Sequence, residues 1–355
     1  MGRFGGKDPV DVQDFVIVQA VSNKNISGYE ATDFGVVVTC HNSEKTISRT
    51  LLSILSQSHV EPNRVVVVDD ASSDNSREII EKFPFKSIFL TKNIGSGGAK
   101  HAGFLKIKSK FVAFLDSDDV WDVNFIETQI EAWNKADPNT AAIGFGLRLE
   151  SNKADLGLEF QNLSKNRNLG YVNLNDLWLS NPFTNSSTVY DVEKLKSIGG
   201  YSKIHGVDDF DTIIRLYQKG YKLFVGPEKL GVYGISDDSI SKNVELQFQA
   251  QIRSYKLLAS FFPEQIDKSK MRKKIQTLWL RSIAKCANYN LNNKSIPTLK
   301  SIGLHWSYLK IMEVAFQVAI LWYLTKRIWT YWNKIRLIIY RRGFFTRETN
   351  NSLIK

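Results

Sequence analysis

The chain has 355 residues, of which 43% are hydrophobic and 12% aromatic. That composition supplies a sizeable apolar core and excludes a fibrous or fully disordered protein. The formal net charge of +11 leaves three classes of acidic partner open: nucleic acid, anionic lipid and phosphorylated small molecules.

The positive charge is concentrated at the C-terminal end. Residues 271–355 hold 16 Lys and Arg against two acidic residues, whereas residues 1–270 are slightly acidic. A protein that reads duplex DNA carries its basic surface on a folded domain, so this distribution argues against nucleic acid as a partner. The first residues lack the apolar core of a signal peptide, and two cysteines are too few for a disulfide framework. We therefore expect a reducing, cytoplasmic location.

In chain order, residues 1–33 are polar and weakly patterned, and we interpret them as an N-terminal extension. From residue 34, short β-branched runs alternate with amphipathic stretches, a pattern typical of buried parallel strands and covering helices. The predicted strands are 35–39, 64–69, 87–91, 111–116 and 141–149, and the predicted helices are 44–58, 72–83 and 95–108. This alternation predicts an α/β domain over 34–242, with a mostly parallel central sheet, helices on both faces and ligands beyond the carboxyl ends of the strands.

The C-terminal part of the chain reads as helical. Residues 243–300 are predicted to hold helices at 244–262 and 271–290, followed by a basic tail over 301–355. An uncharged run at 314–325 is too short for the roughly 20 residues of a membrane span. Beyond it, apolar side chains share one helical face and cations the other: Ile328, Trp332, Ile335 and Ile339 against Lys326, Lys334 and Arg341. This pattern predicts an interfacial helix on an anionic membrane surface, although the same stripe could dock on the catalytic domain or on a second copy in an oligomer.

Carboxylates gather where predicted strands end. Asp70 follows the second strand, Asp116 and Asp118 follow the fourth, and Asp209 precedes an amphipathic helix predicted at 210–219. Two carboxylates at positions i and i+2 after a strand can bind a hard cation such as Mg²⁺ or Mn²⁺. The simpler alternatives are a polar turn at 116–119 and a helix cap at 208–209.

Taken together and in order, seven segments resemble inverting glycosyltransferase family 2, whose members have the GT-A fold. They are GVVVTCHN (35–42), VVVVDDASSDNS (65–76), NIGSGGAKHAG (93–103), FVAFLDSDDVW (111–121), IGGY (198–201), VDDFDTIIRL (207–216) and SISKN (239–243). The resemblance implies metal-dependent transfer from a nucleotide sugar, for which we expect a UDP-sugar. We expect a glycan acceptor. The predicted membrane tail further suggests a polyprenyl-diphosphate-linked oligosaccharide, in surface polysaccharide biosynthesis at the inner face of the cell membrane.

The same resemblance assigns roles to individual residues. Thr39 and His41 would touch the donor base, Asp70 would read the edge of that base, and Asn93 and Lys100 would lie beside the nucleotide. At the fourth strand, Asp116 would contact the ribose or the metal, and Asp118 would bind the metal, Mn²⁺ or Mg²⁺. The catalytic base would be Asp209.

The chain departs from the family pattern at three positions. Lys100 stands where the family usually has Arg, Asp208 where it usually has Glu, and Gly234 follows Tyr233 where the family often has Arg. The segment 181–187 and Trp121 match regions that line the family's sugar pockets, although Trp121 suits a core position equally well. Two rivals stay open: a nucleotidyltransferase with a similar fold, and a non-catalytic binding module that the tail recruits to the membrane.

Overall fold

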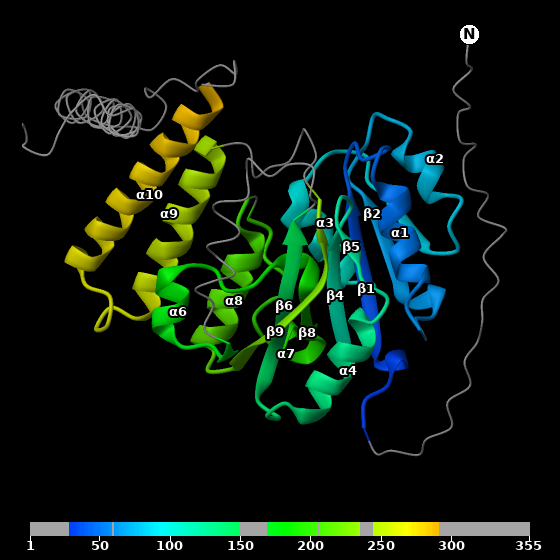
Figure 1. Ribbon diagram of the computed structural model, residues 1–355, viewed down its shortest axis with the longest axis horizontal. Helices are drawn as coiled ribbons and strands as arrows, with labels where there is room; N and C mark the ends of the chain where they lie inside the picture. The colour runs from blue at the N-terminus through cyan, green and yellow to red at the C-terminus, as the bar shows by residue number, and fades with distance from the viewer. Residues whose placement is uncertain (1–27, 59, 150–168, 205, 235–243, 291–355) are drawn as a thin grey trace, which may run out of the picture. The chain divides into compact units, whose positions relative to one another are not determined.

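The computed structural model describes residues 28–58, 60–149, 169–204, 206–234 and 244–290 (Figure 1). The predicted tail over 301–355 and most of the N-terminal extension lie outside these residues. Within the described part, nine strands form one sheet. They are β1 (Phe34–Cys40), β2 (Val65–Asp69), β3 (Lys86–Phe89), β4 (Phe111–Asp116), β5 (Val120–Trp121), β6 (Thr140–Leu149), β7 (Gly170–Tyr171), β8 (Thr188–Asp191) and β9 (Lys222–Tyr233).

Helices α1 to α8 lie between these strands in the chain, and α9 and α10 follow the last strand. They are α1 (Ile47–Leu55), α2 (Ser76–Ile80), α3 (Gly95–Phe104), α4 (Phe125–Lys135), α6 (Leu174–Leu179), α7 (Val192–Ser197), α8 (Asp208–Gln218), α9 (Val244–Phe261) and α10 (Lys268–Asn290). Short 3₁₀ turns are η2 (Ala31–Asp33), η3 (Pro62–Arg64) and η5 (Asn185–Ser187). In Figure 1, α9 and α10 run side by side.

The sheet order is β3-β2-β1-β4-β8-β6-β9-β5, with β7 paired to β9. Strands β3, β2, β1 and β4 are parallel, which confirms the four strands predicted in this half. Strand β6 was also predicted. Its neighbour β8 runs antiparallel to both β4 and β6, whereas β6 and β9 are parallel, so the sheet is mostly parallel, as predicted. Strand β8 has only four residues and β9 contains a Gly-Pro pair, so neither shows the long apolar run that predicts a buried strand.

Alternating residues of β1 contact different helical layers, as the period of a strand requires. Val36 and Val38 belong to the apolar cluster that contains Leu51 of α1 and Trp133 of α4. Val37 lies on the opposite face, where it meets Gly103 of α3. Both faces of the parallel strands are therefore buried, which explains their continuous valine runs.

Helix α8 begins two residues earlier than predicted. Its N-cap residue is Val207, whose side chain makes no capping hydrogen bond, and Asp208 and Asp209 lie in the first helical turn. The helix cap considered for this pair is therefore wrong. Negative charge in the first turn still interacts favourably with the helix dipole.

Helix α10 is attached to α6 by a buried lysine. Lys274 donates from Nζ to the carbonyl oxygens of Trp178 at 2.5 Å and Leu179 at 2.9 Å, and its ammonium lies 4.1 Å from the ring centroid of Tyr255. Burial lowers the pKa of Lys274 to about 8, with Arg281 acting in the same direction. Among the described helices, none is long and apolar enough to cross a bilayer.

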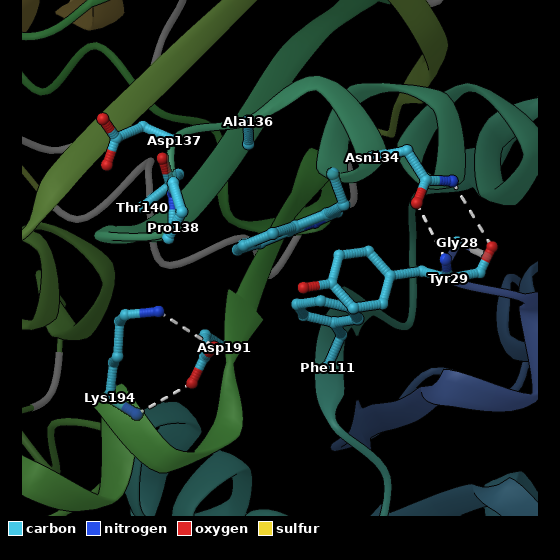
Figure 2. A pocket seen from close by; sticks show the side chains of 11 residues that line it. Gly28, Tyr29, Phe111, Asn134, Ala136, Asp137, Pro138, Thr140, Asp191 and Lys194 are labelled. Atoms are coloured by element: carbon cyan, nitrogen blue, oxygen red, sulfur yellow. Dashed lines mark hydrogen bonds and ion pairs between the residues drawn. The ribbon is translucent and has the colours of Figure 1, made fainter.

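A hollow of about 440 Å³ opens at the amino ends of β4 and β6 (Figure 2). Phe111 and Thr140, the first residues of these strands, line it, and the Asp191–Lys194 ion pair stands at its wall. Asn134 holds the segment before β1 by two hydrogen bonds: its Oδ1 accepts the N–H of Tyr29, and its Nδ2 donates to the Tyr29 carbonyl. None of the predicted site residues lines this hollow, because their carboxylates stand at the opposite ends of the strands.

The close approach of α3 to the sheet depends on Gly103. A Cβ at this position would overlap Val37 Cγ1 and lie 3.0 Å from Val68 Cγ2. We expect Gly103→Ala to lower the free energy of unfolding by about 1–3 kcal/mol, measured by urea denaturation, because overpacking outweighs the better helix propensity of Ala. In a Val37→Ala background the same substitution should cost less, since the overlapping methyl is gone. An equal cost in both backgrounds would contradict this account.

Candidate active site

The carboxyl ends of β1, β2 and β4 bring three predicted site residues to one edge of the sheet. The parallel register pairs Thr39 with Asp116, and Asp70 directly follows β2. Thr39 Oγ1 donates to Asp116 Oδ1 at 3.4 Å. This edge is where open α/β sheets bind their ligands.

Lys100 joins the strand edge to helix α8. Its Nζ lies 2.9 Å from Asp116 Oδ1 and 3.1 Å from Asp208 Oδ2, and its side chain is only 4% exposed. Ser96, one turn earlier on α3, donates to the other oxygen of Asp208 at 3.1 Å. Helix α3 can approach this closely because residue 97 is glycine: a Cβ there would lie 2.9 Å from Asp208 Cβ.

The charge on Lys100 is sustained by its two partners. Burial alone would lower the pKa of the ammonium, but the adjacent carboxylates of Asp116 and Asp208 outweigh burial and raise it. Lys100 is thus a permanent cation between two anions, and it leaves this part of the site with one net negative charge. The structure places Lys100 among carboxylates, so its position beside the nucleotide stays a prediction.

Asp209, next in the chain to Asp208, has a different environment. It is half-buried; its Oδ2 accepts a hydrogen bond from Asn181 Nδ2 at 2.8 Å, and its Oδ1 accepts one from the N–H of Phe210 at 2.7 Å. Desolvation raises the pKa of Asp209 to about 7, and the negative charge of Asp208 adds to the rise. A carboxylate with a pKa near neutrality can accept a proton during a reaction and release it afterwards.

The turn after β4 is held by hydrogen bonds from α1 and from the end of β9. Arg49 of α1 donates to the carbonyl oxygen of Asp118 at 2.9 Å. Asp119 is buried, its Oδ1 accepts the N–H of Gly234 at 2.8 Å, and burial together with Asp118 and Asp116 raises its pKa well above the usual range. A Cβ at Gly234 would overlap the carbonyl oxygen of Asp118, so an arginine, common here in the resembling family, has no room.

Trp121, which follows this turn, belongs to the core. It is 3% exposed, its ring stacks on Phe125 with centroids 4.0 Å apart, and its Nε1 donates to the carbonyl of Ser186 at 2.5 Å. The interpretation of Trp121 as a sugar platform is therefore wrong. Its burial helps to hold the segment 181–187 against the site.

The predicted base-binding residues lie beside Asp70. His41 donates from Nδ1 to the Asp70 carbonyl at 2.8 Å, which leaves Nε2 as an acceptor and the ring exposed. The Asp70 carboxylate is buried and accepts the N–H of Ile94 at 2.8 Å, and Asn93 Oδ1 accepts the N–H of Gly95 at 2.9 Å. The contact between Asp70 and Ile94 ties the end of β2 to the start of α3. We call the surface formed by His41, Asp70 and Asn93 the rim.

The donor set at the strand edge fits a hard divalent cation. Asp116 and Asp118 stand two residues apart, and each keeps part of its surface exposed. The described residues include no group of three His, Cys, Asp or Glu arranged to hold a metal. Mg²⁺ and similar ions often take only one or two protein carboxylates and complete their coordination with waters and substrate phosphates. Two carboxylates therefore suffice for an ion that arrives with a diphosphate.

Comparison with known proteins identifies the family. Residues 35–183, which include β1, β2 and β4, match the family described as glycosyl transferase family 2. This segment is a family 2 glycosyltransferase domain. The resemblance inferred from the motifs is thereby confirmed.

Individual relatives of the chain support this assignment. WfgD of Escherichia coli, named a UDP-Glc:α-D-GlcNAc-diphosphoundecaprenol β-1,3-glucosyltransferase, is 31% identical over 161 residues, which cover 42% of this chain and 62% of WfgD. TuaG of Bacillus subtilis, named a putative teichuronic acid biosynthesis glycosyltransferase, is 25% identical over 59% of this chain and 81% of its own length. The chain spans less than two thirds of the length of WfgD, and it spans 33% of the length of another curated relative.

A solved structure confirms the fold. The mannosyltransferase PcManGT from Pyrobaculum calidifontis, in complex with GDP-Man and Mn²⁺, superposes with a TM-score of 0.54 at 18% identity, covering 87% of this chain and 86% of that one. The chain therefore has the predicted GT-A fold.

Several residues of the site were not singled out from the sequence. Asn181 and Asn185 appeared only within a segment of interest, and Ser96, Arg49 and Tyr201 did not appear as site residues. Each donates a hydrogen bond to a segment distant in the chain, and a single polar residue gives no periodic signal. The segment 181–187 itself, with two asparagines four residues apart, was the available clue.

The buried ion-pair network around Lys100 predicts a strong effect of replacing this residue. Lys100→Met should lower the free energy of unfolding by roughly 3 kcal/mol, because it leaves the Asp208 carboxylate buried without a cation. Urea denaturation measures the loss, and Lys106→Met, at an exposed lysine just after α3, is the matched control. Equal stability of the two variants would refute the proposed importance of the network.

Proposed function

We propose that this protein is a metal-dependent inverting glycosyltransferase that moves a sugar from a UDP-sugar to a glycan or a polyprenyl-diphosphate-linked oligosaccharide. The observation that carries the proposal is the pair of neighbouring aspartates at the start of α8. Asp208 is bound through Lys100 to the strand-edge carboxylate Asp116, while Asp209 is half-buried with a pKa raised to about 7. One aspartate is thus used for structure and the other is available as a base.

The chemistry follows from this division. Asp209 accepts the proton of the acceptor hydroxyl as that oxygen attacks the anomeric carbon, and a single displacement inverts the configuration there. Asp116 and Asp118 would hold the divalent ion, which, when bound, neutralises the departing diphosphate. Asp208, paired with Lys100, keeps the charge beside Asp209 fixed during the reaction.

We place the nucleotide of the donor at the rim around Asp70. In the proposal, Thr39 and His41 contact the base, the Asp70 carboxylate accepts the pyrimidine N–H, and Asn93 and Lys100 lie near the nucleotide. WfgD supports UDP as the nucleotide, since its name states a UDP-glucose donor, and it supports a lipid diphosphate as the acceptor. The PcManGT complex with GDP-Man and Mn²⁺ supports a nucleotide sugar and a metal in this fold.

We further propose that the protein works at the cytoplasmic face of the membrane. The support is the basic amphipathic pattern of residues 301–355 and the membrane-linked acceptor in the name of WfgD. A lipid-linked acceptor requires an enzyme that approaches the bilayer. The same tail could instead join two copies of the chain.

Replacement of Asp209 tests the base assignment. We expect Asp209→Asn to reduce transfer by roughly 10²–10⁴-fold, because an amide cannot accept the hydroxyl proton. UDP binding in the presence of Mn²⁺, measured by calorimetry, should stay within about two-fold of wild type. Asp267→Asn, at an exposed position before α10, is the matched control. Wild-type transfer by Asp209→Asn would exclude this residue as the base, and release of diphosphate rather than UDP would indicate a nucleotidyltransferase.

The pKa of Asp209 predicts the pH dependence of transfer. The base acts only when deprotonated, so kcat/KM should fall about ten-fold per pH unit below a midpoint near pH 7. The charged groups that act on the pKa of Asp209 are Asp208, Lys100 and Asp116. Tyr190 and Tyr201 also face Asp209, whose charge helps to raise their own pKa values. Initial rates with saturating Mn²⁺ from pH 5 to 9 measure the profile. A midpoint below pH 5 would contradict the environment described for Asp209.

A further inference from the structure

The loop between α6 and β8 contacts both halves of the site through two asparagines. Asn181 Nδ2 donates to Asp209 Oδ2 at 2.8 Å, and Asn185 Nδ2 donates to Asp116 Oδ2 at 3.0 Å. The two residues are only four apart in the chain, yet the carboxylates that they bind belong to α8 and to the end of β4. One short segment therefore touches the acceptor side and the donor side of the proposed reaction.

Each amide is held in one orientation by a second hydrogen bond. Asn181 Oδ1 accepts the N–H of Phe183 at 3.0 Å, which directs Nδ2 toward Asp209. Asn185 Oδ1 accepts the hydroxyl of Tyr201 at 2.7 Å, which directs Nδ2 toward Asp116. A side-chain amide accepts with its oxygen and donates with its nitrogen, so a donor bound to the oxygen fixes the direction in which the nitrogen donates.

The segment 181–187, which carries both asparagines, is itself fixed to the sheet. Phe183 is 4% exposed and packs on Gly144 of β6, where a Cβ would lie 2.5 Å from the phenyl ring. Ser187 Oγ donates to the carbonyl of Phe145 at 2.6 Å, and Ser186 Oγ accepts the N–H of Asp116 at 3.1 Å. The loop thus contacts both the main chain and the side chain of Asp116.

An amide suits these two positions for a physical reason. A hydrogen bond from a neutral donor orients a carboxylate and favours its ionised form, while leaving its negative charge in place. A lysine at position 181 would stabilise the anion much further and weaken Asp209 as a base. At position 185 a second cation would compete with the metal for Asp116, which already pairs with Lys100.

We propose that residues 181–187 form a positioning loop, in which Asn181 orients the catalytic base and Asn185 orients the donor-side carboxylate. Neither residue needs to touch substrate. The loop sets the separation between the group that removes the proton and the group that holds the departing nucleotide. This inference rests on the proposed function for the roles of Asp209 and Asp116, although the contacts themselves do not.

Because the two asparagines serve different carboxylates, their removal should change different quantities. Asn181→Ala should lower kcat about ten-fold or more and move the acid midpoint of kcat/KM up by about one pH unit, with UDP–Mn²⁺ affinity within two-fold of wild type. Asn185→Ala should weaken UDP–Mn²⁺ binding by about ten-fold, measured by calorimetry, and leave the acid midpoint unchanged. Asn175→Ala, at an exposed asparagine of α6, is the matched control and should behave as wild type.

A second measurement follows the Asp209 proton without turnover. An acid whose pKa is raised on folding adds stability at low pH, and this contribution disappears as the pH rises from its unfolded value of about 4 to its folded value. The Tm difference between wild type and Asp209→Asn should therefore change over this interval and level off near pH 7. In the Asn181→Ala background, the same difference should level off about one pH unit higher, because the hydrogen bond that favours the anion is gone.

The outcomes separate the two proposals. If both asparagine variants alter the same parameter, or if Asn181→Ala leaves the Tm-derived midpoint in place, the positioning loop is refuted. If no nucleotide sugar is turned over by the wild-type protein while the Tm-derived midpoint still moves in Asn181→Ala, the proposed function fails and the orientation of Asp209 by Asn181 stands.

Discussion

The ion pairs of Lys100 are the constraint on which the site depends. A single buried ammonium lies between Asp116 at the end of β4 and Asp208 at the start of α8, so it connects the parallel half of the sheet to the helix that carries Asp209. Burial of a charge is unfavourable unless it is paired, and here each carboxylate also needs the cation. The arrangement therefore fixes where α8 begins relative to the strand edge. It also explains the glycine at position 97, which lets α3 approach α8.

The two adjacent aspartates illustrate how environment divides roles between identical side chains. Asp208 is paired with a cation and a serine hydroxyl, whereas Asp209 meets only neutral donors and the negative charge of its neighbour. Desolvation and the charge of Asp208 outweigh the hydrogen bond from the Phe210 N–H and the charge of Lys100, so the pKa of Asp209 rises toward neutrality. The resemblance leads to an expectation of Glu at position 208, but the shorter Asp208 side chain still reaches Lys100, so this division of roles is kept.

Much of the fold and the outline of the site could be predicted from the sequence. The valine runs in β1 and β2 are local signals, because strands buried on both faces must be apolar throughout. The carboxylates at the ends of β2 and β4 are equally local, and they stand where sheets of this kind bind ligands. Strands β8 and β9 and the supporting contacts of Asn181, Asn185 and Arg49 were not predicted. These depend on pairing between segments far apart in the chain, which local patterns do not encode. Trp121 shows the same limit, since its ring could suit a sugar or a core until its stacking on Phe125 was known.

The sequence by itself determined the family resemblance, the positions of the main parallel strands and the acidic residues at the strand ends. Each of these is encoded in contiguous motifs. Only the tertiary structure decided which acids are paired and which one is available as a base. It also decided that residue 234 must be glycine, since its backbone packs against the carbonyl of Asp118. The physical reason is that charge pairing, desolvation and close backbone contact depend on distances across the fold. Those distances arise only when α3, α8 and the loop at 181–187 pack together at the end of β4.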